Sequence, residues 1–489
     1  MSSATKLMLI LFAFVFSAAL GRPAQAKIVN ANSCKQSDVQ AAINSASNGD
    51  TVNIPDGSCS WSGTINLTIA ITLQGVSSPG ACSYPNGGTV CGLQITDNNP
   101  TVCTNHGAPC QPDGSNLLII NEVPGFRTVL GNMSFHPGTG VGNYILLRGA
   151  GGLPTLFHDI SMENSAQMIN QMQWMQQGGV IWNFDLYSTN NLAGACNTVV
   201  GAPGNGGLFV NSTYNWDNSS SMGTLDTNGD INLYIEDSRF YQVDQTPDVG
   251  DNGRVVLRHM IIDGSSGLTH GPTGPTGGRQ VEYYQDSLLY SLGNRNVNRY
   301  FWLRSGTLVM TQNNIQWINS GCYPNKPTFT AIVESALSNA SNHGCCTITA
   351  TGNSCWHQPG TGAQSSPTFN PSNLYTSQTG AGGVGGDNHQ VIDPVYIWNN
   401  TGTGQGSAHY GTNESGLTLN CNTINPNTGQ AYKTADFFRS GIEYFYDDTS
   451  NPNSGAKPGW APYTYPHPLR SGSSGPAPAP PTNPTAVVH

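Results

Sequence analysis

The chain has 489 residues, and its formal net charge of −10 argues against nucleic acid or an anionic membrane as a partner. Charged residues make up only 9% of the sequence, against roughly 25% in an average globular domain. Gly is abundant, with 59 residues, and Asn, Ser and Thr supply much of the polarity. This composition favours one elongated, stacked domain over the two or three globular domains that the length would allow.

Residues 1–26 have the pattern of an export signal. Lys6 gives a positive start, an apolar core runs from Leu7 to Leu20, and Ala24-Gln25-Ala26 forms a small-x-small cleavage site. The apolar stretch is too short to span a bilayer comfortably, and no later segment is apolar enough to do so. We therefore expect cleavage near Ala26 and a secreted, extracellular or periplasmic protein without membrane insertion.

The mature chain begins with signals for a helix and then a strand. Ser37 and Gln40 have the spacing of a capping box, and Gly49 suits the C-terminal cap of a helix. Between them lies an apolar stripe at helical spacing, formed by Val39, Ala42, Ile43 and Ala46. Residues 50–57, DTVNIPDG, predict a strand and a turn.

The stretch from Asp38 to Gly57, DVQAAINSASNGDTVNIPDG, resembles the N-terminal cap and first coil of the pectin-lyase-like β-helix superfamily. In that family a short amphipathic helix plugs the open end of the coil. The resemblance implies an all-β, right-handed parallel β-helix solenoid over residues 27–470, with a short capping helix at its N-terminal end.

Twelve cysteines follow the cleavage site. An even number in an exported chain indicates disulfides; a zinc site is the alternative, but no CxxC pair is present to start one. Neighbouring cysteines suggest three local bridges, Cys34–Cys59, Cys82–Cys91 and Cys103–Cys110. The pairing of the other six cysteines stays open: Cys196, Cys322, Cys345, Cys346, Cys355 and Cys421. Cys322 is the nearest candidate partner for the cluster of Cys345, Cys346 and Cys355.

A short phrase recurs along most of the chain: an apolar run, a polar pivot, then another apolar residue. The steps 132→159, 237→259, 259→286 and 286→313 are 27, 22, 27 and 27 residues, a period typical of stacked supersecondary units. Two short strands around a polar corner predict a right-handed parallel β-helix with one coil per repeat. The pivots should then lie in one column of corners, with hydrogen bonds between neighbouring coils. The residues expected in this column are Asn132, Asp159, Asp237, His259 and Asp286.

Three irregular stretches predict long loop insertions, at residues 76–115, 188–230 and 319–390. Long loops on a rigid solenoid are where binding clefts are usually built. Beyond them, residues 437–469 are rich in aromatic side chains, which predicts a cap over the last coil or, alternatively, a platform for stacking sugars. Residues 471–489 have the composition of a Pro-rich linker or disordered tail.

Arginine is concentrated in one part of this acidic chain. Between residues 239 and 304 lie seven arginines: Arg239, Arg254, Arg258, Arg279, Arg295, Arg299 and Arg304. Neighbouring coils stack at about 4.8 Å, so a cluster in sequence becomes a cluster in space. Arg258 follows Glu236 by one coil, and a ladder of self-neutralising Glu–Arg pairs is one interpretation. The other is recognition of carboxylate ligands, which arginine pairs with in bidentate fashion.

Uronic-acid polysaccharides carry such carboxylates. A lyase removes the proton at C5 beside the carboxylate, and a cation on that carboxylate stabilises the charge that develops. His270 is the candidate base, although an ordinary turn histidine is the alternative. Residues 254–289 are similar in outline to the chondroitinase-B/alginate-lyase type of β-helix lyase, whose Arg-His-Gly strand end supplies catalytic groups; here Thr269 stands in place of that arginine.

The sequence therefore predicts a polysaccharide lyase site on the outer face of residues 233–304. His270 would be the base, with Arg258, Arg279 and Glu282 as further catalytic groups. Substrate would be bound by Arg254, Arg304 and Glu236. A non-catalytic extracellular binding, adhesion or fibre-forming β-helix protein is the alternative function.

Motifs for three other chemistries are partial or absent. Asp226, Asn228 and Asp230 alternate like ligands of a calcium loop, but the spacing is not that of an EF-hand, and an Asx-rich turn is the alternative. Polygalacturonase-type hydrolases need neighbouring aspartates, and the only Asp-Asp pair is Asp447-Asp448. No Gly-x-Ser-x-Gly esterase elbow is present.

Overall fold

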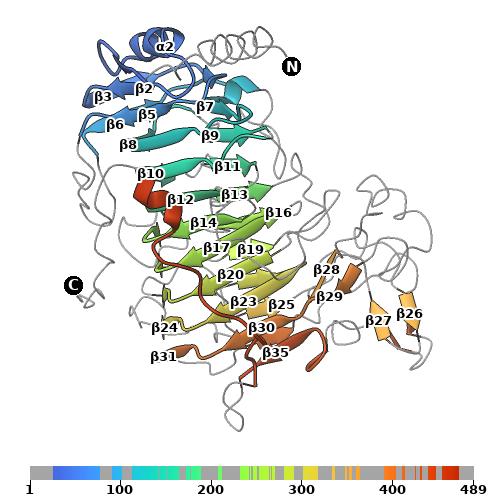
Figure 1. The fold of residues 1–489 in the computed structure, drawn as a ribbon. Helices are drawn as coiled ribbons and strands as arrows, with labels where there is room; N and C mark the ends of the chain where they lie inside the picture. Colours follow the sequence, from blue (N-terminus) through green and yellow to red (C-terminus); the bar gives the residue numbers. More distant parts are fainter. Residues whose placement is uncertain are drawn as a thin grey trace, which may run out of the picture.

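Three rows of parallel strands make up the body of the protein (Figure 1). The computed structural model describes residues 26–77, 91–101, 113–140, 143–149, 151–164, 172–176, 178–188, 208–211, 232–241, 243, 246–250, 253–263, 265, 267–269, 280–290, 301–317, 333–335, 347–349, 352–354, 360–363, 390–403, 410–412, 424–425, 430–431, 439–447 and 454–472. Most of these residues form short strands, and the chain visits each row once per coil. The arrangement is consistent with an all-β parallel β-helix.

The first and second faces of the coil join into one long parallel sheet. The first face pairs β1 (Ile28–Asn30), β2 (Thr51–Ile54), β5 (Thr72–Gly75), β8 (Val129–Pro137), β10 (Leu156–Asn164), β12 (Gly179–Ser188), β14 (Leu233–Glu236), β17 (Arg254–Arg258), β20 (Gln280–Tyr284), β23 (Thr307–Thr311), β30 (Val395–Trp398) and β35 (Tyr444–Tyr446). The second face contains β3 (Gly57–Trp61), β6 (Leu93–Asp97), the latter halves of β8, β10 and β12, then β15 (Arg239–Tyr241), β18 (Ile261–Asp263), β21 (Ser287–Tyr290), β24 (Asn314–Trp317) and β31 (Thr401–Thr403).

The third face is a separate parallel sheet. It contains β4 (Ile65–Leu67), β7 (Asn116–Asn121), β9 (Asn143–Arg148), β11 (Met172–Met175), β13 (Leu208–Asn211), β16 (Asp248–Gly250), β19 (Gly267–Thr269), β22 (Phe301–Leu303), β25 (Val333–Ser335) and β32 (Tyr410–Thr412). Among the described residues, three antiparallel pairs stand apart from these parallel sheets: β26 (Thr347–Thr349) with β27 (Gly352–Ser354), β28 (Thr361–Ala363) with β29 (Gln390–Ile392), and β33 (Ile424–Asn425) with β34 (Gln430–Ala431). The first two pairs fall inside the predicted insertion 319–390 or at its end.

The core is a narrow column of apolar side chains along the coil axis. One inward column on the first face, set by the strand register, runs through Leu130, Phe157, Ile181, Ile235, Leu257 and Tyr283, all of them buried. Each burial contributes roughly 1.5–3 kcal/mol relative to an exposed side chain. Because each coil buries its side chains against the coils above and below, the repeats support one another.

The corners between the first and second faces are left-handed, as eight positive φ angles show. They occur at Asn132, Asp159, Asn183, Asp237, His259, Gln285, Gln312 and Asn399, which the strand register places in one column. The column was predicted correctly for Asn132, Asp159, Asp237 and His259. It was wrong by one residue at Asp286, because Gln285 has the φ of 60° and aligns with His259.

Asp286 belongs to a second column, one residue after the corners, which forms the expected polar ladder. The backbone N–H of Met260 donates to Asp286 Oδ1 at 2.8 Å, and the N–H of Asp286 donates to Asn313 Oδ1 at 3.0 Å. The N–H of Asn313 donates in turn to Asn400 Oδ1 at 3.1 Å. At the corner these backbone N–H groups no longer pair with a neighbouring strand, and each donates to one of these side-chain oxygens instead.

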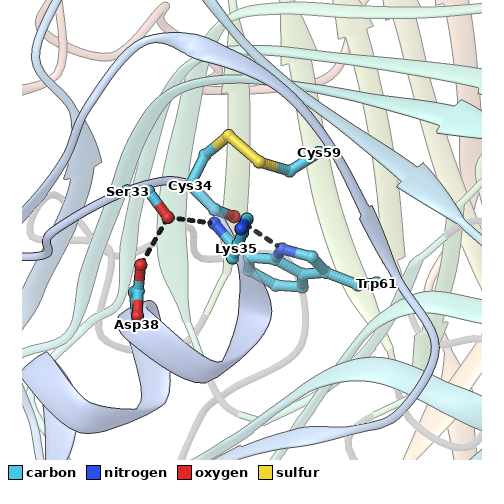
Figure 2. The surroundings of a disulfide bond; sticks show 6 residues. All are labelled: Ser33, Cys34, Lys35, Asp38, Cys59 and Trp61. Atoms are coloured by element: carbon cyan, nitrogen blue, oxygen red, sulfur yellow. Dashed lines mark hydrogen bonds between the residues drawn. A yellow bond between two sulfur atoms is a disulfide. The ribbon is translucent and has the colours of Figure 1, made fainter.

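The helix α2 (Gln36–Asn44) packs at the N-terminal end of the coil through Val39, Ala42 and Ile43. It begins earlier than the predicted capping box: Lys35 occupies the N-cap without a side-chain hydrogen bond, so Ser37 already lies inside the helix. The predicted bridge between Cys34 and Cys59 is confirmed. Figure 2 shows this disulfide beside Trp61, whose indole N–H donates to Cys34 O at 3.0 Å.

The C-terminal strap, residues 454–471, lies along the outside of the first face (Figure 1). It runs from the last coil back to β12, where η4 (Pro468–Gly472) ends it. For the aromatic residues 437–469 the sequence predicted a cap over the last coil or a platform for stacking sugars. Tyr444–Tyr446 pair with β30 at the end of the coil. Trp460, Tyr463 and Leu469 pack instead against outward side chains of several coils: Leu156, Val180, Trp182, Tyr234, Val256 and Tyr284.

Cys91 is also disulfide-bonded; its predicted partner Cys82 and the other predicted bridges lie outside the described residues. In the described part of the chain no helix is long and apolar enough to cross a membrane. The predicted export signal, apart from Ala26, falls outside that part.

Candidate functional site

Each strand of the first face has two positions whose side chains point outward, and the strand register shows which predicted site residues share a position. Strand register aligns Glu236 with Arg258 and Tyr284, and aligns Val256 with Glu282. Glu236, Arg258 and Glu282 therefore lie close to one another under the C-terminal strap. Arg304 follows β22 on the third face, at a different edge of the coil.

Glu236 and Arg258 form a fully buried ion pair. Arg258 Nε donates to Glu236 Oε1 at 2.7 Å, and its Nη1 donates to the Tyr284 hydroxyl at 2.9 Å. The same guanidinium donates to the backbone carbonyls of Tyr463 at 3.1 Å and Thr464 at 2.8 Å. This is the self-paired ladder that the sequence left open as an alternative to carboxylate recognition.

The strap completes this cluster with a second arginine. Arg470 Nη1 donates to Glu236 Oε2 at 2.8 Å, and the backbone N–H of His467 donates to the same oxygen at 3.1 Å. Burial by itself would raise the pKa of Glu236, but the charges and hydrogen bonds of Arg258 and Arg470 outweigh it and hold the pKa below its ordinary value. Glu236 and Arg258 are both fully buried and paired with each other, so neither reaches solvent.

Glu282 is buried at the margin of the strap. Gln280 Nε2 donates to its Oε1 at 3.0 Å, and the Trp460 indole donates to its Oε2 at 3.2 Å. Burial raises the pKa of Glu282 to about 7, and the positive charge of Lys457 opposes that rise. The pKa of this carboxyl group is therefore close to neutral pH. Its contact in the structure is with Trp460 of the strap, and its predicted role beside His270 stays a prediction.

The edge between the third and first faces holds the other part of the predicted site. Arg304, partly exposed, donates from Nε to Thr269 O at 3.0 Å, and its backbone N–H donates to Thr269 Oγ1 at 2.9 Å. Its guanidinium carbon lies 4.8 Å from the centre of the partly exposed Trp302 ring. Arg304 thus contacts Thr269, the residue that directly precedes His270, and the Trp302 ring lies against the Arg304 cation.

Arg254 starts β17 and is buried, aligned with Gln280 at the start of β20. His270 and Arg279 lie outside the described residues, as do Asp226, Asn228 and Asp230 of the predicted calcium loop. Among the described residues, no group of three or more His, Cys, Asp or Glu side chains is arranged to hold a metal ion.

The sequence reasoning missed a row of titratable side chains on the second face. His136 Nδ1 lies 3.0 Å from Glu163 Oε2, and Arg239 pairs with Asp185 through two contacts of 2.8 and 2.9 Å. The ring of Tyr241 lies 5.3 Å from the Arg239 guanidinium carbon. A signal was present, because His136 and Glu163 are 27 residues apart, the same step as the corners.

The chain was compared with known proteins. No family model matches it, and no curated protein matches it. Among solved structures, it is similar to pectin methylesterase PemA from Erwinia chrysanthemi at 8% identity, with 81% of this chain and 94% of that chain covered and a TM-score of 0.31. It is also similar to an alginate lyase from Paenibacillus sp. str. FPU-7 at 9% identity, with 63% and 93% covered and a TM-score of 0.22.

Proposed function

We propose that this protein is an exported, right-handed parallel β-helix of the pectin-lyase-like kind, closed by α2 at its N-terminal end, that cleaves uronic-acid-containing polysaccharide by β-elimination. Right-handedness is supported by the strong bias of parallel crossover connections. The capping role of α2 is supported by its buried face against the first coil.

The observation that carries the functional proposal is the contact between Arg304 and Thr269. It fixes a guanidinium, stacked on Trp302, beside the strand end that leads into His270. Aromatic rings pack against the apolar faces of sugars, and a guanidinium matches a carboxylate in geometry and charge. Both features suit an acidic sugar bound across this edge.

In the proposed reaction Arg304 pairs with the uronate carboxylate, assisted by Arg279. His270 takes the proton from C5, and the electron pair forms the C4–C5 double bond. The C4–O bond breaks, and the departing oxygen takes up a proton from solvent. The arginine stabilises the enolate-like charge, which exists only after proton removal and therefore favours the transition state over the bound substrate.

The test is incubation with a panel of uronate polymers, following the ultraviolet absorbance of the unsaturated product. His270→Ala should lower kcat by roughly 10²–10⁴-fold, the range for loss of a general base. Arg304→Ala should lower kcat/KM by about 10- to 100-fold, through a lower kcat as well as a higher KM, as expected for loss of a charged hydrogen bond of about 1.5–3 kcal/mol that also stabilises the transition state.

Arg127→Ala is the matched control, because Arg127 is a partly exposed arginine whose Nε likewise donates to a backbone carbonyl, Pro154 O, at 3.0 Å on the same edge. It lies several coils away and should leave both constants unchanged. Equal losses in the Arg127 and Arg304 variants would mean that only stability is affected. Polymer binding without any unsaturated product would favour the non-catalytic binding protein.

A further inference from the structure

The corner between the second and third faces, near the N-terminal end of the coil, contains buried polar side chains that point inward. Asp97 ends β6, Asn116 begins β7 and Asn143 begins β9. All three are fully buried at 0% exposure. Polar groups in such a position are rare in folded proteins unless something satisfies them.

Contacts through Asn99 and the strand register place these three residues at the same corner. The backbone N–H of Asn99 donates to Asp97 Oδ1 at 2.8 Å, and Asn99 Nδ2 reaches Asn116 O at 3.5 Å. Asn116 and Asn143 are direct partners in the strand register. The next coil presses on the carboxylate through Gly140, where an added Cβ would lie 2.2 Å from Asp97 Cγ.

Four atoms of this cluster are buried and have no hydrogen-bond partner among the described residues. They are Asp97 Oδ2, Asn116 Oδ1, Asn143 Oδ1 and Asn143 Nδ2. Because both ends of the Asn143 amide are unpartnered, its oxygen is free to turn toward the carboxylate. The cluster then presents three oxygen acceptors, whereas a water molecule can donate only two hydrogen bonds.

We propose that Asp97, Asn116 and Asn143 form a binding site for a hard, oxygen-seeking cation, for which Ca²⁺ is the probe. Carboxylate and amide oxygens are the ligands that such ions take, and a cation satisfies any number of acceptors at once. It also compensates the buried charge of Asp97, for which the structure offers no cationic partner among the described residues. Because Gly140 has no side chain, the Asp97 carboxylate can occupy the space that a Cβ would need.

This site is distinct from the calcium loop predicted at residues 226–230 and does not depend on the proposed lyase activity. It joins the second and third faces across consecutive coils, so its role is structural. Bound Ca²⁺ should therefore stabilise the folded chain by mass action.

The test measures the thermal midpoint and the bound metal of the full chain after chelator treatment and readdition of Ca²⁺, with Na⁺ in parallel. Wild type should gain thermal stability on adding Ca²⁺. Asp97→Asn should lose that gain and one bound ion per chain. The metal-free Asp97→Asn variant should be at least as stable as metal-free wild type, since its side chain is neutral and of the same shape; this separates loss of the ion from misfolding.

The double variant Asp226→Asn/Asp230→Asn is the control and should keep the gain associated with Asp97. The proposal is overturned if Asp97→Asn responds to Ca²⁺ as wild type does, or if neither Ca²⁺ nor Na⁺ stabilises wild type. A response to Na⁺ alone that Asp97→Asn abolishes would support the site and identify the ion as monovalent.

Discussion

Glu282 is a carboxyl group that the fold holds away from water, with two neutral donors, Gln280 and Trp460, on its oxygens. Its pKa is about 7, compared with 4.5 ordinarily, because burial penalises the charged form. The folded state therefore binds this proton more tightly than the unfolded state does. The stability that Glu282 contributes is fully present below pH 4.5 and is lost as the pH rises through about 7.

Glu282→Gln, which stays neutral, should remove this pH dependence. Between pH 4.5 and about 7 wild type should lose stability relative to the variant, by about 3 kcal/mol at about 1.4 kcal/mol per pKa unit. Urea unfolding at several pH values measures the difference. A constant difference across this window would contradict the prediction.

Asp50→Asn is a control in which the stability should depend on pH in the opposite direction. Backbone N–H groups of Lys27 and Ser47 donate to Asp50 and lower its pKa below 3.8. Its contribution is therefore present above pH 3.8 and is lost as the pH falls through the lowered value. The advantage of wild type over this variant should disappear in acid rather than at neutral pH.

At the scale of elements, the C-terminal strap is held to the first face by a shared carboxylate. Glu236 receives Arg258 from the coil and Arg470 from the strap, and Arg470 also contacts Asp237 at 2.5 Å. Tyr284 packs edge-on against Trp460, with ring centres 5.4 Å apart. The strap thus covers an outward apolar row that would otherwise be exposed to water.

Glu236→Ala should destabilise the protein by about 3–5 kcal/mol, because it leaves buried arginines without their counter-charge. Limited proteolysis should cut the strap faster in this variant, while denaturant unfolding gives the total loss. Asp113→Ala is the comparison: both side chains of the Arg148–Asp113 ion pair are partly exposed, so the loss should be about 1 kcal/mol or less. Equal effects of the two substitutions would show that burial of the Glu236 cluster does not matter.

Over the whole molecule, stability is distributed along the coil, because each coil contacts mainly its neighbours. The disulfide Cys34–Cys59 closes a loop of 25 residues at the N-terminal end. Cys34→Ser/Cys59→Ser should cost about 2–4 kcal/mol, and the loss should be local. Amide exchange should accelerate over α2 and β1–β4 while β17–β23 keep their protection; uniform acceleration along the chain would contradict this view.

The sequence alone determined the repeat. A polar pivot between short apolar runs predicted the corner column, since left-handed backbone favours Asn, Asp and His, and proximity in sequence predicted the bridge between Cys34 and Cys59. It could not separate Gln285 from Asp286, because both are polar residues at the end of the same strand.

Only the tertiary structure decided which of the clustered arginines is buried. Arg258 and Arg304 are both arginines near the repeats, yet Arg258 is buried against Glu236, whereas Arg304 is partly exposed beside Trp302. The difference comes from the strap, whose residues are about 200 positions away from Arg258 in the chain. A periodic sequence predicts how coils stack, but the contact of a distant segment with their outer surface depends on three-dimensional packing that no local pattern encodes.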